Sequence, residues 1–326
     1  KCSKKVPLKS KEKNRQRDPS IQKAERKIVA SSQNQKQQLK HAGFINKGNT
    51  CYANAILQAL STIPMFWCQQ PSESGFISPL ASTISLNLSL LPKRSSQTDP
   101  SNFLRVLQTV ISKHRGNPFN TNTQQDASEI LQIIIDELKR TSPTADDIIS
   151  SSYLNVTTCE HCLNFTRHET KEDIIQLPLS NSLTASLETF LSPYYLRGSN
   201  RWFCTLCDSL QDSVRETQFV RCGNVLIFHL LRYVNSNGRF IKDNRKVYLS
   251  KDLTIPVRVD DSISMQRKFK LRASINHSGT QDAGHYWAFI NDALSNSWLK
   301  CNDSTVIPVS FNDLNNYSSY LLIYSI

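Results

Sequence analysis

Two Cys-x-x-Cys pairs constrain the fold of this chain more than any other feature of its sequence. Cys159 and Cys162 form the first pair, Cys204 and Cys207 form the second, and 41 residues lie between them. Each pair falls where a strand pattern meets a tight turn, and four thiolates from two such knuckles make the closed tetrahedral site of structural zinc. The intervening segment is longer than in a minimal zinc ribbon, so we expect a folded, hairpin-like insert that brings the knuckles together. Zinc binding would then contribute folding energy locally, because unfolded knuckles have no preformed site.

Other interpretations of these cysteines have less support. Four unligated thiols could share the spacing, and His161 could replace one cysteine ligand from inside the first knuckle. A redox Cys-x-x-Cys would need a thioredoxin-like βαβ context, which the sequence lacks. The nine cysteines make an odd count, and the first residues contain no apolar core of a secretory signal. These features favour a reducing interior over a disulfide framework, so we expect an intracellular protein, in the nucleus and/or the cytoplasm.

The positive charge of the chain is concentrated in one segment. Residues 1–40 hold 13 Lys and Arg against three acidic residues, and the net charge of the whole chain is +12, so the other 286 residues carry only about +2. A nucleic-acid-binding domain would show a basic face on its folded part, so nucleic acid is not the expected partner. The basic tail is predicted to be a solvated linker, a nuclear-import segment, a docking segment for a regulatory protein, or a helix from about Ile21 to Leu39.

The pattern of apolar residues divides the folded part into a helical half and a strand-rich half. Helical spacing occurs at three places, namely residues 50–62, 101–114 and 123–139. Residues 64–100 are rich in Ser and Pro and are predicted to be mostly connection. From about residue 150, short β-branched or aromatic runs broken by turn residues predict strands. This order predicts an α+β architecture.

The length and the ends of the chain add two expectations. No apolar run approaches the roughly 18–20 residues that a membrane span requires, so we expect no membrane partner. The chain begins with Lys rather than Met, and we expect it to be a piece of a longer protein. Its folded domain is predicted to run from residue 41 to residue 326, after the basic tail.

A candidate nucleophile lies at the first turn of the predicted helix 50–62. A helix N-terminus presents unpaired N–H groups and partial positive charge, which would favour the thiolate of Cys51 over the thiol. Gly43 and Gly48 precede it and permit close approach of a substrate carbonyl. The side-chain amide of Asn46 could donate to a developing oxyanion. A cysteine at a helix start is by itself more often a packing residue, so this assignment needs a partner base.

His285 is the best candidate for that base among the seven histidines. It follows Gly284 at the start of a predicted strand, where its side chain is well placed to face a cleft. A group that orients it should accept a hydrogen bond from the other ring nitrogen, and Asn302 and Asp303 on the next predicted strand supply such acceptors. Cys301 is predicted to be a packing residue. The following histidines are predicted to be surface or core residues: His41, His114, His168, His229 and His277.

Together these segments resemble the ubiquitin-specific protease family of papain-like cysteine deubiquitinases. GFINKGNTCYANAILQAL resembles the Cys box of the family, TQQDASEIL its QQD box, and HSGTQDAGHYWAFI followed by WLKCNDSTV its His box. The Cys-x-x-Cys pairs are similar to the zinc site in the family's fingers, and LIFHLLRYV is similar to its buried strand. The resemblance covers about residues 41–326, and five separated motifs carry it in the right order.

The resemblance implies a right-hand architecture with a helical thumb, a β palm and zinc-tipped β fingers that hold ubiquitin. The thumb would span about residues 41–150, and the palm and fingers residues 151–326. Two segments, 235–244 and 277–284, would form loops over the ubiquitin tail. The implied reaction is hydrolysis of the (iso)peptide bond after the C-terminal glycine of ubiquitin through a Cys51 thioester, with ubiquitin or ubiquitinated proteins as partners.

The family's catalytic roles carry over by position. Cys51 would be the nucleophile, His285 the general base, and Asn302 the third member of the triad. Asp303 would support that triad and could share the role of Asn302, and Asn46 would stabilise the oxyanion.

Substrate contacts also follow from the resemblance. Asp126 and Glu129 would face the ubiquitin tail, where arginines of the tail explain the carboxylates. Further contacts are implied for Gln125, Gly284 and Tyr286.

Three alternatives to this function stay open at the level of the sequence. The first is a ubiquitin-binding scaffold that keeps the fold but has an unproductive site. The second is a protease for a ubiquitin-like modifier that shares the Gly-Gly end. The third is a zinc-ribbon nucleic-acid binder with a basic arm, against which the near-neutral body already argues.

Overall fold

The computed structural model describes residues 40–64, 79–89, 91–93, 97–120, 123–142, 144–236, 238–260, 264–280, 283–293, 295 and 297–326. Residues 40–326 form one compact unit. The predicted helix from Ile21 to Leu39, and with it the basic tail up to residue 39, lies outside the described residues. Among the residues described, no helix combines the length and the apolar content that crossing a bilayer would need.

Most of the described helices precede residue 150. The helices are α2 (Cys51–Leu60), α4 (Pro79–Ser89), α5 (Ser101–Arg115), α6 (Ala127–Thr141), α7 (Ala145–Ile149), α8 (Leu183–Leu191), α9 (Phe311–Leu314) and the 3₁₀ helix η1 (Gly198–Asn200). The three helices predicted from spacing correspond to α2, α5 and α6. The prediction that residues 64–100 are mostly connection did not include α4, which occupies Pro79–Ser89 of that segment.

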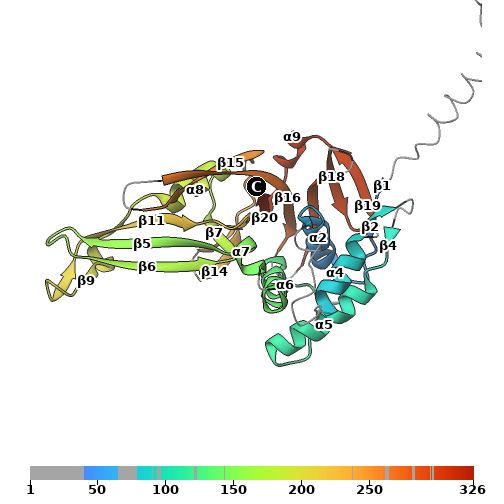
Figure 1. Cartoon of the computed structure of the whole chain (residues 1–326), viewed down its shortest axis with the longest axis horizontal. Coiled ribbons are helices and arrows are strands. Elements are labelled where there is room, and N and C mark those ends of the chain that lie inside the picture. The colour runs from blue at the N-terminus through green and yellow to red at the C-terminus, as the bar shows by residue number, and fades with distance from the viewer. Residues whose placement is uncertain are drawn as a thin grey trace, which may run out of the picture. The chain divides into compact units, whose positions relative to one another are not determined.

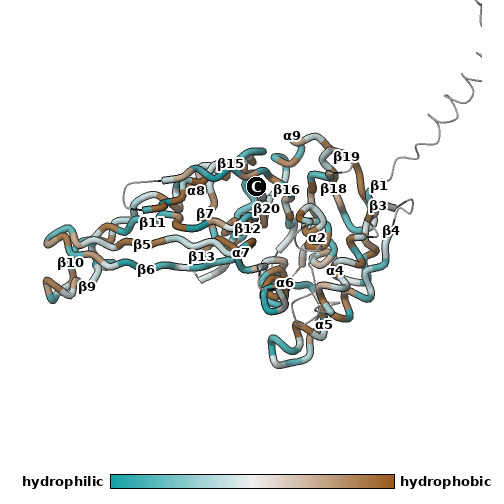
Figure 2. Tube along the Cα trace, viewed as in Figure 1, coloured by the Kyte–Doolittle hydropathy of each residue, from teal (hydrophilic) through white to brown (hydrophobic). Residues whose placement is uncertain are grey.

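Sequence signals explain where these helices begin and end. On α5, one apolar stripe faces the core through Phe103, Leu107 and Ile111, at the spacing of an amphipathic helix. That helix ends at Gly116, whose φ of 71° is the left-handed conformation that glycine adopts readily at helix ends. The alternation of apolar and polar residues along the helices can be followed in Figure 2. Amphipathic spacing therefore predicts the buried face of α5 correctly.

The strands fill most of the chain after residue 150. Their bounds are β1 (Lys40–His41), β2 (Gly43–Phe44), β3 (Pro92–Lys93), β4 (Gln97–Thr98), β5 (Ser151–Cys159), β6 (Phe165–Glu172), β7 (Ile174–Pro178), β8 (Tyr194–Leu196), β9 (Trp202–Cys204), β10 (Ser209–Gln211), β11 (Ser213–Arg221), β12 (Val225–Leu231), β13 (Tyr233–Ser236), β14 (Arg239–Lys242), β15 (Asp252–Arg258), β16 (Ser264–Gly279), β17 (Gly284–Asp292), β18 (Ser297–Asn302), β19 (Thr305–Val309) and β20 (Ser319–Ser325). The architecture is α+β, as predicted.

One twelve-stranded sheet dominates the described residues, and its main path runs β19-β18-β17-β16-β15-β11-β5-β6. β16 connects the two parts of this sheet, because it pairs with β15 near its start and with β17 and β20 near its end. In Figure 1, β5, β6 and β11 extend away from α2, α4, α5 and α6, and β9 lies at their far end. The division into thumb, palm and fingers at residue 150 stays a prediction.

Helix α2 is buried along its whole length. It packs against β16, β17 and β18 on one side and against α4 and α6 on the other, as Figure 1 shows. Strand β17 is buried on both faces, since Ala288 and Ile290 belong to the core around α2, whereas Trp287 and Phe289 belong to a second core. This packing holds the start of α2 close to the ends of β17 and β18.

Candidate active site

The loop before α2 places Cys51 at the first position of that helix. Gly48 and Asn49 have φ values of 97° and 51°, and this left-handed turn directs the chain into the helix. Asn46 Oδ1 accepts hydrogen bonds from Gly48 N at 2.9 Å and from Thr50 N at 3.2 Å. Cys51 is a free cysteine and is 4% exposed. The predicted position of this thiol at a helix N-terminus is confirmed.

The structure brings His285 and Asn302 together at the ends of two paired strands. His285 is the second residue of β17 and Asn302 is the last residue of β18. His285 Nε2 lies 2.5 Å from Asn302 Oδ1, and because this amide oxygen can only accept, Nε2 carries the donated proton. The other ring nitrogen, Nδ1, is left for Cys51. Both residues are among those that the sequence analysis selected.

The electrostatics distinguish His285 from the other histidines nearby. The hydrogen bond with Cys51 raises the pKa of His285 to about 9, against the opposing effect of burial; the bond to Asn302 and the charges of Cys51 and Asp303 add to the rise. Burial, together with the charge of Lys242, lowers the pKa of His277 to about 4. At neutral pH, therefore, His285 is protonated and His277 is neutral. An imidazolium beside a thiolate is the arrangement that a cysteine nucleophile uses.

Asp303 joins the loop of Cys51 to the turn after β18. Its Oδ2 accepts from Asn46 Nδ2 at 2.9 Å, and its Oδ1 accepts from Asn54 Nδ2 at 2.8 Å. Its backbone carbonyl accepts from Phe44 N at 2.9 Å. A Cβ at Gly43 would lie 2.5 Å from that carbonyl oxygen, so the close approach of the two segments requires glycine. Asp303 itself has a φ of 49°, which is uncommon for an aspartate.

Asp126, predicted to face the substrate, caps helix α6. Its Oδ1 accepts from Ser128 N at 2.7 Å and from Glu129 N at 3.2 Å, and its Oδ2 accepts from Tyr320 Oη at 2.6 Å. Burial raises the pKa of Asp126, but the hydrogen bonds from Ser128, Tyr320 and the helix backbone outweigh it, and the net shift is downward. Both carboxylate oxygens are therefore already bonded within the chain, and a contact with substrate stays a prediction.

Arg115 binds Gln125 and Glu129, which were also predicted to contact the substrate. Its Nη2 donates to Glu129 Oε1 at 2.7 Å and to Gln125 Oε1 at 3.3 Å. A substrate arginine would have to share Glu129 with Arg115. Gly284 N donates to Gln124 Oε1 at 3.2 Å, so Gln124 supports this side of the site. The sequence analysis missed Gln124, although the motif TQQDASEIL contains it.

Tyr286 lies buried beside the candidate site. Its side chain is 3% exposed, and its ring stacks on that of His277 with centroids 4.3 Å apart. The substrate contact implied for Tyr286 stays a prediction. Alternate residues of a strand point to opposite faces, so Tyr286 and its neighbour His285 have different surroundings. Gly284 packs against the same histidine, since a Cβ there would overlap with His277 Nε2.

Lys242, which the sequence analysis also missed, ties β14 to the end of β16. Its Nζ lies 2.8 Å from His277 Nδ1, and it donates to His277 O at 3.0 Å and to Gly279 O at 3.3 Å. Burial and the charge of Arg232 lower the pKa of Lys242 to about 8. The two segments predicted to cover the ubiquitin tail, 235–244 and 277–284, are therefore connected where they are described. Residues 237, 281 and 282 in them lie outside the described part.

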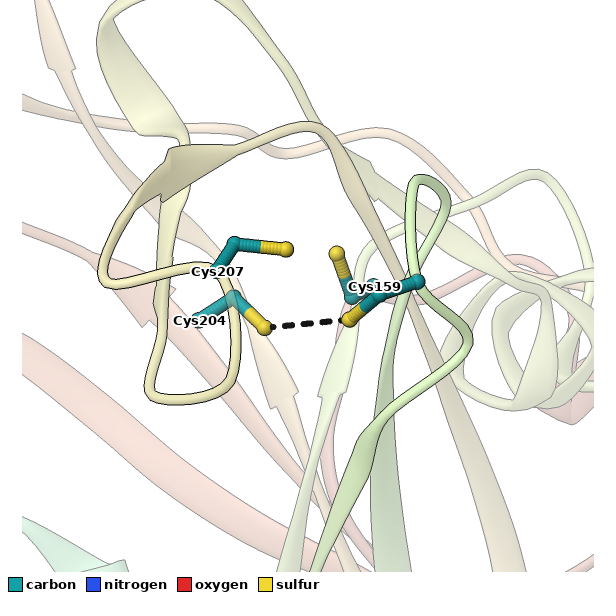
Figure 3. A group of neighbouring side chains, drawn as sticks. Cys159, Cys204 and Cys207 are labelled. Carbon is teal, nitrogen blue, oxygen red and sulfur yellow. Dashed lines mark hydrogen bonds between the residues drawn. The ribbon is translucent and has the colours of Figure 1, made fainter.

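The four cysteines of the Cys-x-x-Cys pairs come together in space, as predicted. They are Cys159, Cys162, Cys204 and Cys207, and their sulfurs all lie within 4.8 Å of one another. Figure 3 shows three of these thiols pointing toward one another from two loops. The first loop joins β5 to β6 and the second joins β9 to β10. This cluster could hold a metal ion.

The local backbone fits two metal knuckles. Leu163 and Asp208 follow the second cysteine of each pair, with φ values of 61° and 51°, so both turns close in the same left-handed way. Four sulfurs at about 2.3 Å from a zinc ion would be about 3.8 Å apart, and Cys162 Sγ lies 3.5 Å from Cys204 Sγ. His161 Nδ1 is 3.5 Å from Cys207 Sγ, outside the group of four. The donor set and the spacing therefore suit zinc.

The sequence profile of ubiquitin carboxyl-terminal hydrolases matches residues 42–324. The chain belongs to this family. Membership confirms the resemblance that the motifs predicted and gives the enzyme class, which is a cysteine-type deubiquitinase. The matched range contains the Cys51 loop, the α6 start, the four cysteines and the His285–Asn302 pair.

Curated relatives of this hydrolase are distant in sequence. Ubiquitin carboxyl-terminal hydrolase 4 of Arabidopsis thaliana is 27% identical, over 87% of this chain and 93% of the relative. Ubiquitin carboxyl-terminal hydrolase 22 of Homo sapiens is 26% identical, over 86% of this chain and 65% of the relative. Ubiquitin carboxyl-terminal hydrolase 51 of Mus musculus is 25% identical, over 86% of this chain and 50% of the relative. The chain thus spans about two-thirds of the length of the human relative and half of the length of the mouse relative.

Solved structures share the fold of this hydrolase. The SAGA DUB module Ubp8/Sgf11/Sus1/Sgf73 bound to monoubiquitin matches with a TM-score of 0.70 and 20% identity, over 95% of this chain and 76% of that chain. The same module bound to ubiquitin aldehyde matches with a TM-score of 0.71 and 20% identity, over 94% of this chain and 74% of that chain. At this identity the likeness supports the fold.

Proposed function

We propose that this deubiquitinase hydrolyses the (iso)peptide bond after the C-terminal glycine of ubiquitin, with Cys51 as nucleophile, His285 as general base and Asn302 as the residue that orients the base. The observation that carries the proposal is the hydrogen-bonded series from Cys51 to His285 to Asn302. It combines a thiol at a helix N-terminus, an imidazole with a raised pKa and an amide that fixes the ring. These are the parts that thiol-dependent acyl transfer requires.

The reaction would proceed in two acyl-transfer steps. The Cys51 thiolate attacks the carbonyl of the terminal glycine, and the His285 imidazolium gives its proton to the leaving lysine amine. Water then attacks the thioester while neutral His285 takes its proton, and the free carboxylate leaves. Asn46 Nδ2 carries two hydrogens, of which Asp303 accepts one, so the other is available for the oxyanion.

The four-cysteine cluster would hold zinc in a structural role. All four ligand positions of a tetrahedral ion would be thiolates, which leaves no position for substrate. The ion would supply folding energy to the tip of the β5, β6 and β11 projection. The two structural neighbours that carry ubiquitin support the same partner here, and four thiols gathered as metal ligands support a location in the nucleus and/or the cytoplasm, where thiols stay reduced.

Turnover of ubiquitin with a C-terminal fluorophore tests the catalytic assignment. Cys51→Ala is expected to abolish turnover while ubiquitin binding stays, and Cys301→Ala, which removes a buried thiol elsewhere, is expected to keep it. Asn302→Ala should slow turnover less than His285→Ala, because Asn302 orients the proton carrier and does not transfer the proton. Persistent cleavage by Cys51→Ala would refute the mechanism.

Two other outcomes would favour the alternative functions, which are a ubiquitin-binding scaffold and a protease for a ubiquitin-like modifier. If an electrophilic ubiquitin probe binds but fails to label Cys51, the chain is a scaffold with an unproductive site. If a probe made from a ubiquitin-like modifier labels Cys51 faster than the ubiquitin probe, the substrate is that modifier. Equal losses for Asn302→Ala and His285→Ala would contradict the separate roles given to them.

A further inference from the structure

One buried polar residue on the helix of Cys51 has no part in the reaction described so far. Asn54 lies one turn after Cys51 on α2 and is 2% exposed. Its Nδ2 donates to Asp303 Oδ1 at 2.8 Å, across 249 positions of sequence. Burying an amide costs free energy unless it is hydrogen-bonded. The contact with Asp303 is the shortest hydrogen bond that the structure gives this amide.

The Asp303 carboxylate links Asn54 to Asn46. Asn54 binds one of its oxygens, and Asn46 Nδ2 binds the other at 2.9 Å. A carboxylate held at both oxygens has a fixed plane. At its other end, Asn46 is fixed through Oδ1 by Gly48 N and Thr50 N. The amide of Asn46 is thus held from two sides, and Asn54 is the buried anchor of one of them.

The charge of Asp303 also determines which way the Asn54 amide points. Asn54 Oδ1 is buried and has no hydrogen-bond partner in the described part of the chain. Rotating the amide would set this oxygen against the Asp303 carboxylate, where two acceptors would repel and no hydrogen bond would form. The orientation in which Nδ2 faces Asp303 therefore leaves Oδ1 without a hydrogen bond. The hydrogen bond to Asp303 outweighs the free energy that this unpaired oxygen costs.

We propose that Asn54 is a positioning residue for the hydrolysis: its amide holds the Asp303 carboxylate, which in turn holds Asn46 so that the second hydrogen of Asn46 Nδ2 meets the oxyanion. This inference rests on the proposed function. It makes the loop of Cys51, the helix that follows and the turn after β18 one connected unit. The effect of Asn54 acts after substrate has bound, because the oxyanion exists only in the tetrahedral intermediates and the transition states next to them.

An isosteric exchange tests this series of contacts. Asn54→Asp sets two carboxylates against each other, and Asp303→Asn leaves two amides to share one amide oxygen. We expect each single variant to lower kcat by about 10²-fold with little change in KM, comparable to the loss of one oxyanion donor. In the double variant, the new amide at position 303 donates to the new carboxylate at position 54, and the oxygen of that amide accepts from Asn46. The double variant is expected to recover kcat to within about tenfold of the original.

Asn87→Asp is the matched control. Asn87 is 3% exposed on α4, and its Nδ2 donates to Thr83 O at 2.7 Å, away from the Asp303 series. It reports the general cost of burying an aspartate, and its kcat should stay near the original value.

The comparison that decides the proposal is the double variant against Asp303→Asn alone. It does not need a folded Asn54→Asp protein. A double variant faster than Asp303→Asn supports the proposal, and one that is equally slow or slower overturns it, as does an Asn54→Asp enzyme with unchanged kcat. If the original chain itself fails to cleave ubiquitin substrates, the proposed function fails instead, so the two failures are distinguishable.

Discussion

Arg232 gives a prediction whose size can be worked out from the structure. It lies between β12 and β13, is fully buried, and donates to Ser319 O at 2.6 Å and to the carbonyls of Asp243 and Arg245, each at 2.9 Å. It therefore holds the base of the β13–β14 hairpin against the start of β20. Replacement by Met keeps most of the side-chain volume and leaves three carbonyls without their donor.

Hydrogen bonds from a charged group contribute about 1.5–3 kcal/mol each, so replacing Arg232 by Met removes about 4.5–9 kcal/mol before the cost of burying the charge is taken into account. Removing the buried charge returns part of that loss, because burial already lowers the pKa of Arg232 to about 10. We therefore expect a net loss of about 3 kcal/mol in the free energy of unfolding, and at about 2–4 °C per kcal/mol the Tm measured by thermal unfolding should fall by about 6–12 °C.

Arg221→Met provides the matched control. Arg221 is 37% exposed and pairs with Asp147, whose side chain is 80% exposed. Such surface pairs contribute about 0–1 kcal/mol, so the Tm of this variant should change by only a few degrees. If Arg232→Met and Arg221→Met unfold at the same temperature, the three carbonyl contacts do not stabilise the fold, and the reasoning is refuted.

Two further predictions concern the site and the cysteine cluster. Because the pKa of His285 is raised to about 9, the imidazolium persists below that pH, and kcat/KM should fall as the pH rises through about 9. Asp303→Asn removes a charge that helps to raise this pKa, so in this variant the fall in kcat/KM should begin at lower pH. If kcat/KM of the original chain already falls near the ordinary histidine pKa of about 6.5, the assignment of His285 is contradicted. Cys159→Ser should remove bound zinc, measured by metal analysis, and destabilise the β9–β10 end, whereas Cys222→Ser, at a buried thiol outside the cluster, should keep the metal; equal zinc content would contradict the ligand set.

The sequence could predict the parts of the site that local signals mark. Helical spacing places Cys51 at a helix start, and Cys-x-x-Cys spacing predicts two metal knuckles. The strand pattern brings His285 and Asn302 to paired strand ends. In each case the chemistry lies in a short segment whose residue types are unusual, and the fold only has to bring two such segments together.

Other parts could not be predicted because they depend on contacts between distant segments. Lys242 is an ordinary lysine in the sequence, and only the packing of β14 on the end of β16 gives it three acceptors. Asn54 sits inside an apolar helix, and its partner is 249 residues away. Tyr286 adjoins His285 in the sequence, but alternate residues of a strand point to opposite faces, and only the fold shows that the Tyr286 ring stacks on His277.

Helix α4 could not be predicted for a different reason, which is its weak local preference for helix. Its sequence PLASTISLNLS has four serines or threonines, which favour turns when they are judged locally. In the folded protein, Leu80, Ile84 and Leu88 point into the core, and their burial outweighs the weak local preference.

The contact between Gly43 and the Asp303 carbonyl has a consequence for recognising inactive relatives. Any side chain at position 43 would push the turn of Asp303 away, and that turn also carries Asn302 and the support of Asn46. A homologous chain could retain the cysteine, the histidine and the asparagine and still have lost its chemistry through this one position. We therefore expect that an alanine or a larger residue aligned with Gly43 marks a pseudoenzyme before any of the reacting groups has changed.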